Sequence, residues 1–130
     1  MKIILTILTL SLALFAIDPD DFTNDYNKAI QKAKLQNKDV YMLITSKTCG
    51  WCRKFEVRTL NDKATMDMLK KSYVLLHVTR DKDYIPNNIE AKRVPKHYFL
   101  TKDEKVIHSF LGYWNPEDFK SLLYDIETRK

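Results

Sequence analysis

The chain has 130 residues, 45% of them hydrophobic, with 22 Lys and Arg against 17 Asp and Glu and a net charge of +5. This length allows one hydrophobic core and is too short for two domains. The charges are scattered and form no basic stripe or known binding motif, so we expect no nucleic-acid partner, although a basic face could bind acidic lipids or partners.

The N-terminal segment has a basic second residue followed by a long apolar run. This pattern is typical of a secretory signal peptide, because the run is shorter than the roughly 20 residues of a membrane-spanning helix and Ala13 and Ala16 offer a cleavage site. We therefore expect residues 1–16 to be a signal peptide and residues 17–130 to be one exported domain, periplasmic or otherwise outside the cytosol. An uncleaved signal that tethers the domain remains the alternative, because Leu14 stands where a small residue is preferred.

The rest of the chain alternates helical and extended patterns. Helices are predicted where apolar residues recur at three- and four-residue spacing, and strands where short apolar runs are rich in strand formers. We expect Phe55 and Val57 to reach the sheet from the helix that follows the cysteines. In chain order, the first predicted elements are a helix over 23–36, a buried strand over 40–45, and a helix through the cysteine motif that stops and restarts at Asn61 and Asp62. They are followed by a buried strand over 72–79, a polar loop over 80–93 with one weak helical turn, a hairpin of strands over 96–100 and 106–113, and a helix that begins at Asn115 and Pro116.

Both cysteines lie in the sequence SKTCGWCRKF, residues 46–55, between the end of a predicted buried strand and the start of a helix. Reactive groups of α/β folds belong at such strand ends. Unpaired N–H groups and the helix dipole would stabilise a thiolate at Cys49, and Lys47 would add positive charge. Cys52 lies one turn further in, so the spacing predicts that Cys49 attacks a substrate disulfide and Cys52 resolves the mixed disulfide.

Other uses of the cysteine pair are weaker alternatives. A structural disulfide usually closes a longer loop, because bridging residues three apart removes little entropy from the unfolded chain. A metal site needs more than two ligands, and His77, His97 and His108 lie in predicted strands, where a core or surface imidazole is the expected role. Haem attachment requires a histidine after the second cysteine, where Arg53 stands. We expect no metal and no bound cofactor.

Several features occur in the order of a known family: the C-x-x-C after a strand, the Val94-Pro95 pair before the third strand, and Gly112 ahead of the last helix. Together they resemble the thioredoxin superfamily over residues 20–128. Within it, the sequences CGWCRKFE and FLGYWNPEDF and the split second helix are most similar to small exported thiol reductases and to the periplasmic thioredoxin-like domain of the Dsb-type transmembrane reductase.

That resemblance implies an α/β thioredoxin fold, with a central mixed β-sheet of about four strands flanked by helices. It also implies a thiol:disulfide oxidoreductase, with disulfide reduction preferred over oxidation or isomerisation. The Gly-Trp pair between the cysteines does not indicate the direction of electron flow.

The resemblance also implies a substrate-binding surface. Pro95 would be a cis-proline that faces the cysteines, and Val94 would offer backbone N–H and C=O groups to an extended substrate strand. A trans-proline at a strand start is the alternative. Gly112 would allow the substrate backbone to approach on the other side. We expect Trp51 on the surface beside Cys49, where it contacts a partner protein, or else folded back over its own helix.

One position departs from the family pattern. Many thioredoxins carry a buried aspartate six residues before the first cysteine, where this chain has Leu43. Glu56 lies four residues after Cys52, on the same helical face, and is the available substitute that would accept the proton of the inner thiol. The alternative for Glu56 is an exposed carboxylate that pairs with Arg53 or Lys54.

The sequence thus predicts an exported, monomeric thiol:disulfide oxidoreductase. Its partners would be client proteins with disulfides or thiols and a membrane thiol reductant that supplies electrons. The alternative is a non-catalytic binding or chaperone-like module, which would hold cysteine-containing clients on the surface formed by Trp51, Val94 and Pro95.

Overall fold

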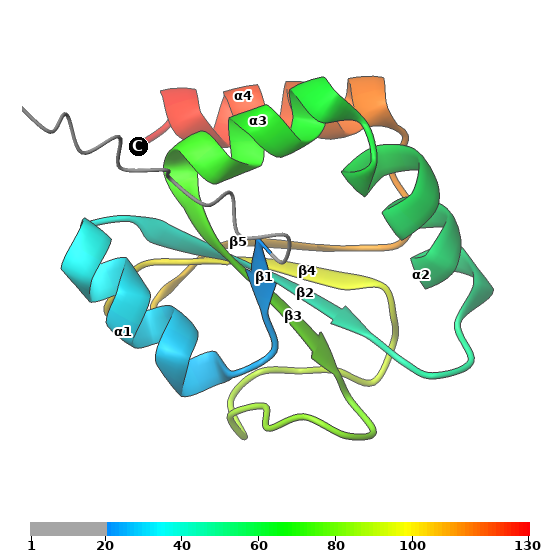
Figure 1. The fold of residues 1–130 in the computed structure, drawn as a ribbon, viewed down its shortest axis with the longest axis horizontal. Coiled ribbons are helices and arrows are strands. Elements are labelled where there is room, and N and C mark those ends of the chain that lie inside the picture. The colour runs from blue at the N-terminus through cyan, green and yellow to red at the C-terminus, as the bar shows by residue number, and fades with distance from the viewer. Residues whose placement is uncertain (1–20) are drawn as a thin grey trace, which may run out of the picture.

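A computed structural model describes residues 21–130, so the predicted signal peptide lies outside the described residues. The described part is a mixed five-stranded sheet with helices on both faces (Figure 1). This architecture confirms the predicted α/β fold, with one strand more than the sequence indicated. Within this part of the chain, no helix is long and apolar enough to cross a membrane.

The elements follow the predicted order closely. Their bounds are β1 (Phe22–Thr23), α1 (Tyr26–Gln36), β2 (Asp39–Thr45), α2 (Gly50–Phe55), the π-helical segment η1 (Glu56–Leu60), α3 (Lys63–Ser72), β3 (Tyr73–Thr79), β4 (Lys96–Leu100), β5 (Val106–Leu111) and α4 (Pro116–Thr128).

The additional strand is β1, which the sequence placed partly at the start of the first helix. Phe22 and Thr23 pair in parallel with Leu75 and Leu76 of β3. The first helix begins later than predicted, because the Asp25 side chain caps it by accepting a hydrogen bond from the N–H of Lys28 at 3.0 Å. The two residues before the cap are thereby free to pair with the sheet edge.

The strands run in the order β1-β3-β2-β4-β5. Strands β2 and β3 are parallel and in register from the Asp39–Tyr73 pair to the Thr45–Thr79 pair. Strand β4 is antiparallel to both β2 and β5, so the predicted hairpin is confirmed. The carboxyl ends of β2 and β3 therefore meet at one edge of the sheet, and the cysteine motif follows β2 at that edge.

Two apolar clusters fill the space on either side of the sheet, which explains why β2 reads as a continuous apolar run. One cluster lies between the sheet and α1, and residues of the 80–93 loop pack against it. The other lies under α2, α3 and α4 and includes Phe55, Leu69, Phe119 and Leu123. The apolar face predicted for the last helix is buried, and Asn115 caps that helix as predicted.

The helix after the cysteines stops and restarts as predicted, with Asp62 as the N-cap of α3. The expectation for Val57 was wrong: Phe55 is fully buried, but Val57 is 60% exposed. Residues two apart point to different sides of a helix, so both side chains cannot reach the sheet. The 80–93 loop contains isolated hydrogen-bonded turns, one of which joins the Asp83 N–H to the Thr79 carbonyl at 2.8 Å.

Candidate active site at the start of α2

The two cysteines form a disulfide at the N-terminus of α2, with their Cα atoms 5.3 Å apart. Cys49 is the N-cap residue, and its Sγ accepts a hydrogen bond from the N–H of Cys52 at 3.1 Å. Cys49 is partly exposed, whereas Cys52 is 2% exposed. A partner molecule can therefore reach the sulfur of Cys49 more easily than that of Cys52.

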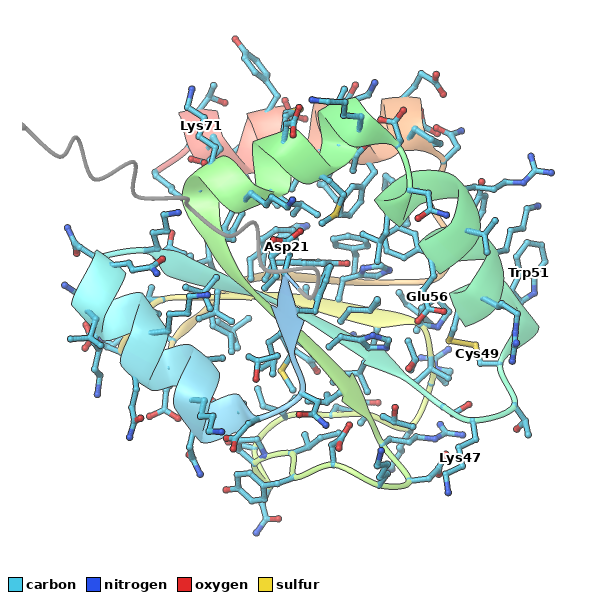
Figure 2. The ribbon with its side chains drawn as sticks, viewed as in Figure 1. Asp21, Lys47, Cys49, Trp51, Glu56 and Lys71 are labelled. Atoms are coloured by element: carbon cyan, nitrogen blue, oxygen red, sulfur yellow. A yellow bond between two sulfur atoms is a disulfide. The ribbon has the colours of Figure 1, made fainter. Side chains whose placement is uncertain are left out.

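Cys49 lies at the N-terminus of α2. Its sulfur lies at the positive end of a helix, where backbone N–H groups stabilise a negative charge. Lys47 is exposed, and its backbone N–H donates to the Asp81 carboxylate at 3.4 Å. Figure 2 shows Lys47, Cys49, Trp51 and Glu56 at the same end of the molecule.

Trp51 lies on the surface with 60% of its area exposed. Its ring packs near Tyr113, which follows β5, with the ring centroids 6.0 Å apart. The Nζ atom of Lys54 lies 4.9 Å from the Trp51 ring centroid and 4.7 Å from that of Tyr113. Trp51 thus joins the helix to the segment after β5 and leaves much of its ring open to solvent.

The segments before β4 and after β5 meet beside the cysteine motif. The Val94–Pro95 peptide bond is cis. The Pro95 carbonyl accepts a hydrogen bond from the Gly112 N–H at 2.8 Å. Gly112 has a φ of 98°, which other residues rarely adopt, and a Cβ built on it would meet no atom within 4 Å. Gly112 therefore faces open space.

A groove of about 640 Å³ runs through this region. It brings together all four residues that the sequence assigned to substrate binding: Trp51, Val94, Pro95 and Gly112. The groove also has lining residues that the sequence did not single out, namely Arg80, Lys92, Arg93, Leu111 and Tyr113. We call this surface the Trp51–Gly112 groove.

Glu56 lies one helical turn after Cys52, because its N–H donates to the Cys52 and Arg53 carbonyls. Its carboxylate points to His77 rather than pairing with a helix cation: the Oε1 atom is 3.3 Å from the Nε2 atom of His77. That same nitrogen lies 2.8 Å from the hydroxyl oxygen of Thr45. Glu56, His77 and Thr45 therefore form a polar group on the side of the sheet covered by α2.

His77 is the residue that the sequence reasoning missed. It pairs across the strands with Leu43, the position where many thioredoxins carry an acid. Burial lowers the pKa of His77, and the nearby carboxylates of Glu56 and Asp83 act in the opposite direction. The alternation of β3, which places His77 on the same face as Tyr73 and Leu75, was the signal available in the sequence.

His97 has a structural environment. Its Nδ1 atom lies 2.7 Å from the Tyr41 hydroxyl oxygen, and its Nε2 atom lies 2.9 Å from the Gly112 carbonyl oxygen. Because a carbonyl can only accept, Nε2 carries the hydrogen and Nδ1 accepts from Tyr41. Burial lowers the pKa of His97 to about 4. Among residues 21–130, no group of three or more His, Cys, Asp or Glu is placed to hold a metal ion.

A mixed sheet with helices on both faces, a C-x-x-C pair at the start of a helix and a cis X-Pro bond nearby are the features of the thioredoxin fold. The family profile described as "thioredoxin-like domain" matches residues 26–127, and this chain belongs to that family.

Individual relatives agree with the family. The uncharacterized protein B0495.5 of Caenorhabditis elegans is 29% identical over an alignment 119 residues long, and the match covers 83% of this chain but only 16% of that protein. The structure of a DsbH oxidoreductase has a TM-score of 0.66 and 14% identity, and the match covers 86% of this chain and 90% of that one. A thioredoxin from Thermus thermophilus has a TM-score of 0.69 and 17% identity, covering 83% and 87%. At such low identities, the TM-scores of these two structures show a shared fold alone.

Proposed function

We propose that this chain is an exported thiol:disulfide oxidoreductase that reduces disulfides of client proteins. The observation that carries the proposal is the arrangement of the two sulfurs: a reachable Cys49 at a helix N-terminus and a shielded Cys52 one turn further in. This arrangement fits a pair that opens and closes during turnover better than a purely structural crosslink.

The reaction begins with both cysteines reduced. The Cys49 thiolate attacks one sulfur of the client disulfide, which forms a mixed disulfide and releases the other client sulfur as a thiolate. Cys52 then loses its proton and attacks the Sγ atom of Cys49. The second client thiolate leaves, and the Cys49–Cys52 disulfide forms. Two electrons have passed from the protein to the client, and an external dithiol must return them.

Glu56 is the proposed acceptor for the proton of Cys52. Glu56 lies one helical turn from Cys52, and its carboxylate pairs with His77, whose Nε2 atom also lies within hydrogen-bond distance of the Thr45 hydroxyl. Burial lowers the pKa of His77, so this imidazole is largely neutral near pH 7 and does not cancel the charge of the carboxylate. A negative charge at this place disfavours the thiolate form of the dithiol, and this favours electron donation.

The setting of the reaction follows from the N-terminal sequence pattern. A signal peptide over residues 1–16 would deliver the domain to an oxidising compartment, periplasmic or otherwise exported. A dithiol is kept reduced there only by a dedicated donor, so we assign the role of donor to a membrane thiol reductant. The domain acts as a monomer, and Trp51, Val94, Pro95 and Gly112 receive the client.

The test is disulfide reduction with insulin as the substrate and a chemical dithiol as the electron source. The wild-type chain should accelerate insulin reduction above the rate of the dithiol alone, and Cys49→Ser should abolish the acceleration. A non-catalytic client-binding module would bind reduced and oxidised clients without any acceleration, and Cys49→Ser would change nothing. That result would refute the enzymatic proposal.

A further inference from the structure

All charged residues that line the Trp51–Gly112 groove are cationic. Arg80, Lys92 and Arg93 line it, and among the described residues no Asp or Glu does so. Lys92 and Arg93 are exposed, and within residues 21–130 neither forms an ion pair. The cationic groups beside the groove are therefore available to a partner.

Arg80 has a different part in this surface. Its guanidinium donates to the Lys92 carbonyl at 2.5 Å and to the Ala91 carbonyl at 3.4 Å, and it pairs loosely with Asp81 at 3.7 Å. These hydrogen bonds fix the backbone that carries Lys92 and Arg93. The loop thus presents two unpaired cations from a backbone position that is already ordered, which lowers the entropy cost of binding.

Another cation, Lys54, contacts two aromatic residues that line the groove. Lys54 lies over the rings of both Trp51 and Tyr113, so its ammonium group is held at the aromatic wall. The groove therefore has an apolar lining, an open approach at Gly112, and positive charge at Lys92 and Arg93. An extended polypeptide with acidic side chains is complementary to such a surface in shape and charge.

We propose that the Trp51–Gly112 groove selects clients in which acidic residues flank the reactive cysteine in an extended segment. This inference rests on the proposed function and names its substrate class. The groove adjoins the cysteine motif through Trp51, so a chain lying in it would bring its own cysteine to Cys49. A hollow of this shape fits a single extended chain better than a flat lipid surface, although both could supply negative charge.

The experiment compares three peptide disulfides that differ only in the residues beside the cysteine: Glu, Gln or Lys. The second-order rate constant for oxidation of the reduced wild-type chain is measured with each at low and high salt. We expect the Glu peptide to react about tenfold faster than the Lys peptide at low salt, with the difference shrinking at high salt because ions screen the exposed charges.

The double variant Lys92→Glu/Arg93→Glu should remove or reverse this preference, which is read as the ratio of its rates with the Glu and Lys peptides, each divided by the rate of the same variant with the Gln peptide. The matched control is Lys28→Glu/Lys34→Glu, which makes the same change of charge on exposed positions of α1. Figure 1 shows α1 and α2 at opposite ends of the sheet, so the control should keep the wild-type preference.

The outcomes separate this inference from the proposed function. Equal rates with all three peptides would overturn the acidic preference and leave the oxidoreductase intact. Absence of reaction with every peptide would instead refute the proposed function. The groove would then be tested by the anisotropy of labelled peptides with serine in place of cysteine, where equal affinity for Glu and Lys peptides overturns the inference. Binding to phosphatidylglycerol vesicles that depends on Lys92 and Arg93 and is not competed by the Glu peptide would also overturn it, in favour of a membrane surface.

Discussion

Glu56 and His77 together occupy the region where many relatives of this chain place a single buried acid. Leu43 makes the usual position apolar, and the polar group is supplied by the helix and the neighbouring strand instead. Because Glu56 is only partly buried, its charge is accessible to water. In the proposed reaction, the proton of Cys52 would therefore leave through Glu56 toward solvent without a fully buried ion.

Replacing Glu56 tests whether this carboxylate sets the redox properties of the pair. Glu56→Gln removes a negative charge near the sulfurs, so it should lower the pKa of the Cys49 thiol and raise the reduction potential by roughly 30 mV for each 1.4 kcal/mol of dithiol stabilisation. The thiolate absorbance against pH and the equilibrium with glutathione measure the two effects. Asp125→Asn, on the exposed side of α4, is the control and should change neither. An unchanged potential in Glu56→Gln would remove the argument for reduction as the direction.

The two cysteines should differ in reactivity as they differ in exposure. In the reduced chain, one equivalent of an alkylating agent at neutral pH should label Cys49 first, because Cys49 is partly exposed and lies at the helix N-terminus. Peptide mass analysis identifies the labelled residue. For the same reason, Cys52→Ser should accumulate mixed disulfides with clients, whereas Cys49→Ser should not. Equal trapping by both variants would contradict a resolving role for Cys52.

At the scale of single residues, the sequence predicted those features of the site that depend on neighbouring residues in the chain. The C-x-x-C spacing and the helix start are local features, and they placed Cys49, Cys52 and Glu56 on one helix. The role of His77 depends on which residues of β2 and β3 lie opposite each other, and this register is a non-local property. The cationic lining at Lys92 and Arg93 lies in a loop whose course no periodicity describes.

The elements that present the site are held by caps as well as by burial. The α2 helix is short, and the chain continues from it into η1, a π-helical turn that begins at Glu56. Such turns occur mostly as single-turn irregularities inside α-helices and are frequent at functional sites. The apolar pattern indicated a helix through this region but could not reveal the change of period, because the buried residues of α2 and η1 are few, namely Cys52, Phe55 and Thr59.

The cap of α4 gives a test at the level of one element. The Asn115 side chain accepts a hydrogen bond from the Asp118 N–H at 2.8 Å. Asn115→Ala should therefore lower the free energy of unfolding by about 1 kcal/mol, as measured by denaturant titration. Asn115→Ser retains a capping oxygen and should stay close to wild type. Equal destabilisation by both substitutions would show that the side chain acts through something other than the cap.

For the whole molecule, the fold could be predicted because the helix, strand and turn patterns along the chain all indicate the same layered architecture. Alternating helical and strand patterns indicated the layered sheet, and turn residues indicated the hairpin. Strand β1 was missed because two residues are too few to show any periodicity. Its pairing depends on the edge of β3, which exists only once the sheet has formed.

The buried His97 makes the stability of the whole domain depend on pH. Its pKa is about 4 in the folded chain against 6.5 for the free side chain, so between these values the unfolded chain binds a proton that the folded chain does not. The free energy of unfolding should therefore fall as pH decreases from about 6.5 to about 4, by roughly 3 kcal/mol from this group, and this contribution should level off below that range.

Denaturant titrations at pH 7 and pH 4.5 measure this effect. His97→Gln should lose stability at pH 7 but should show a smaller difference between the two pH values than the wild-type chain. His108→Gln, at an exposed position of β5, is the control and should keep the wild-type difference. The same pH difference in His97→Gln and wild type would assign the dependence to other groups.

The order of the chain has a consequence for the newly made protein. Both cysteines are synthesised before most residues that line the groove, since Val94, Pro95, Gly112 and Tyr113 all come later in the chain. The partners of β2 in the sheet, β3 and β4, also follow it. Under the proposed function, a growing chain would thus carry its two thiols before the groove that selects clients is complete. Until Tyr113 has been added and contacts Trp51, the Cys49 thiol would exchange with accessible disulfides without selection by the groove.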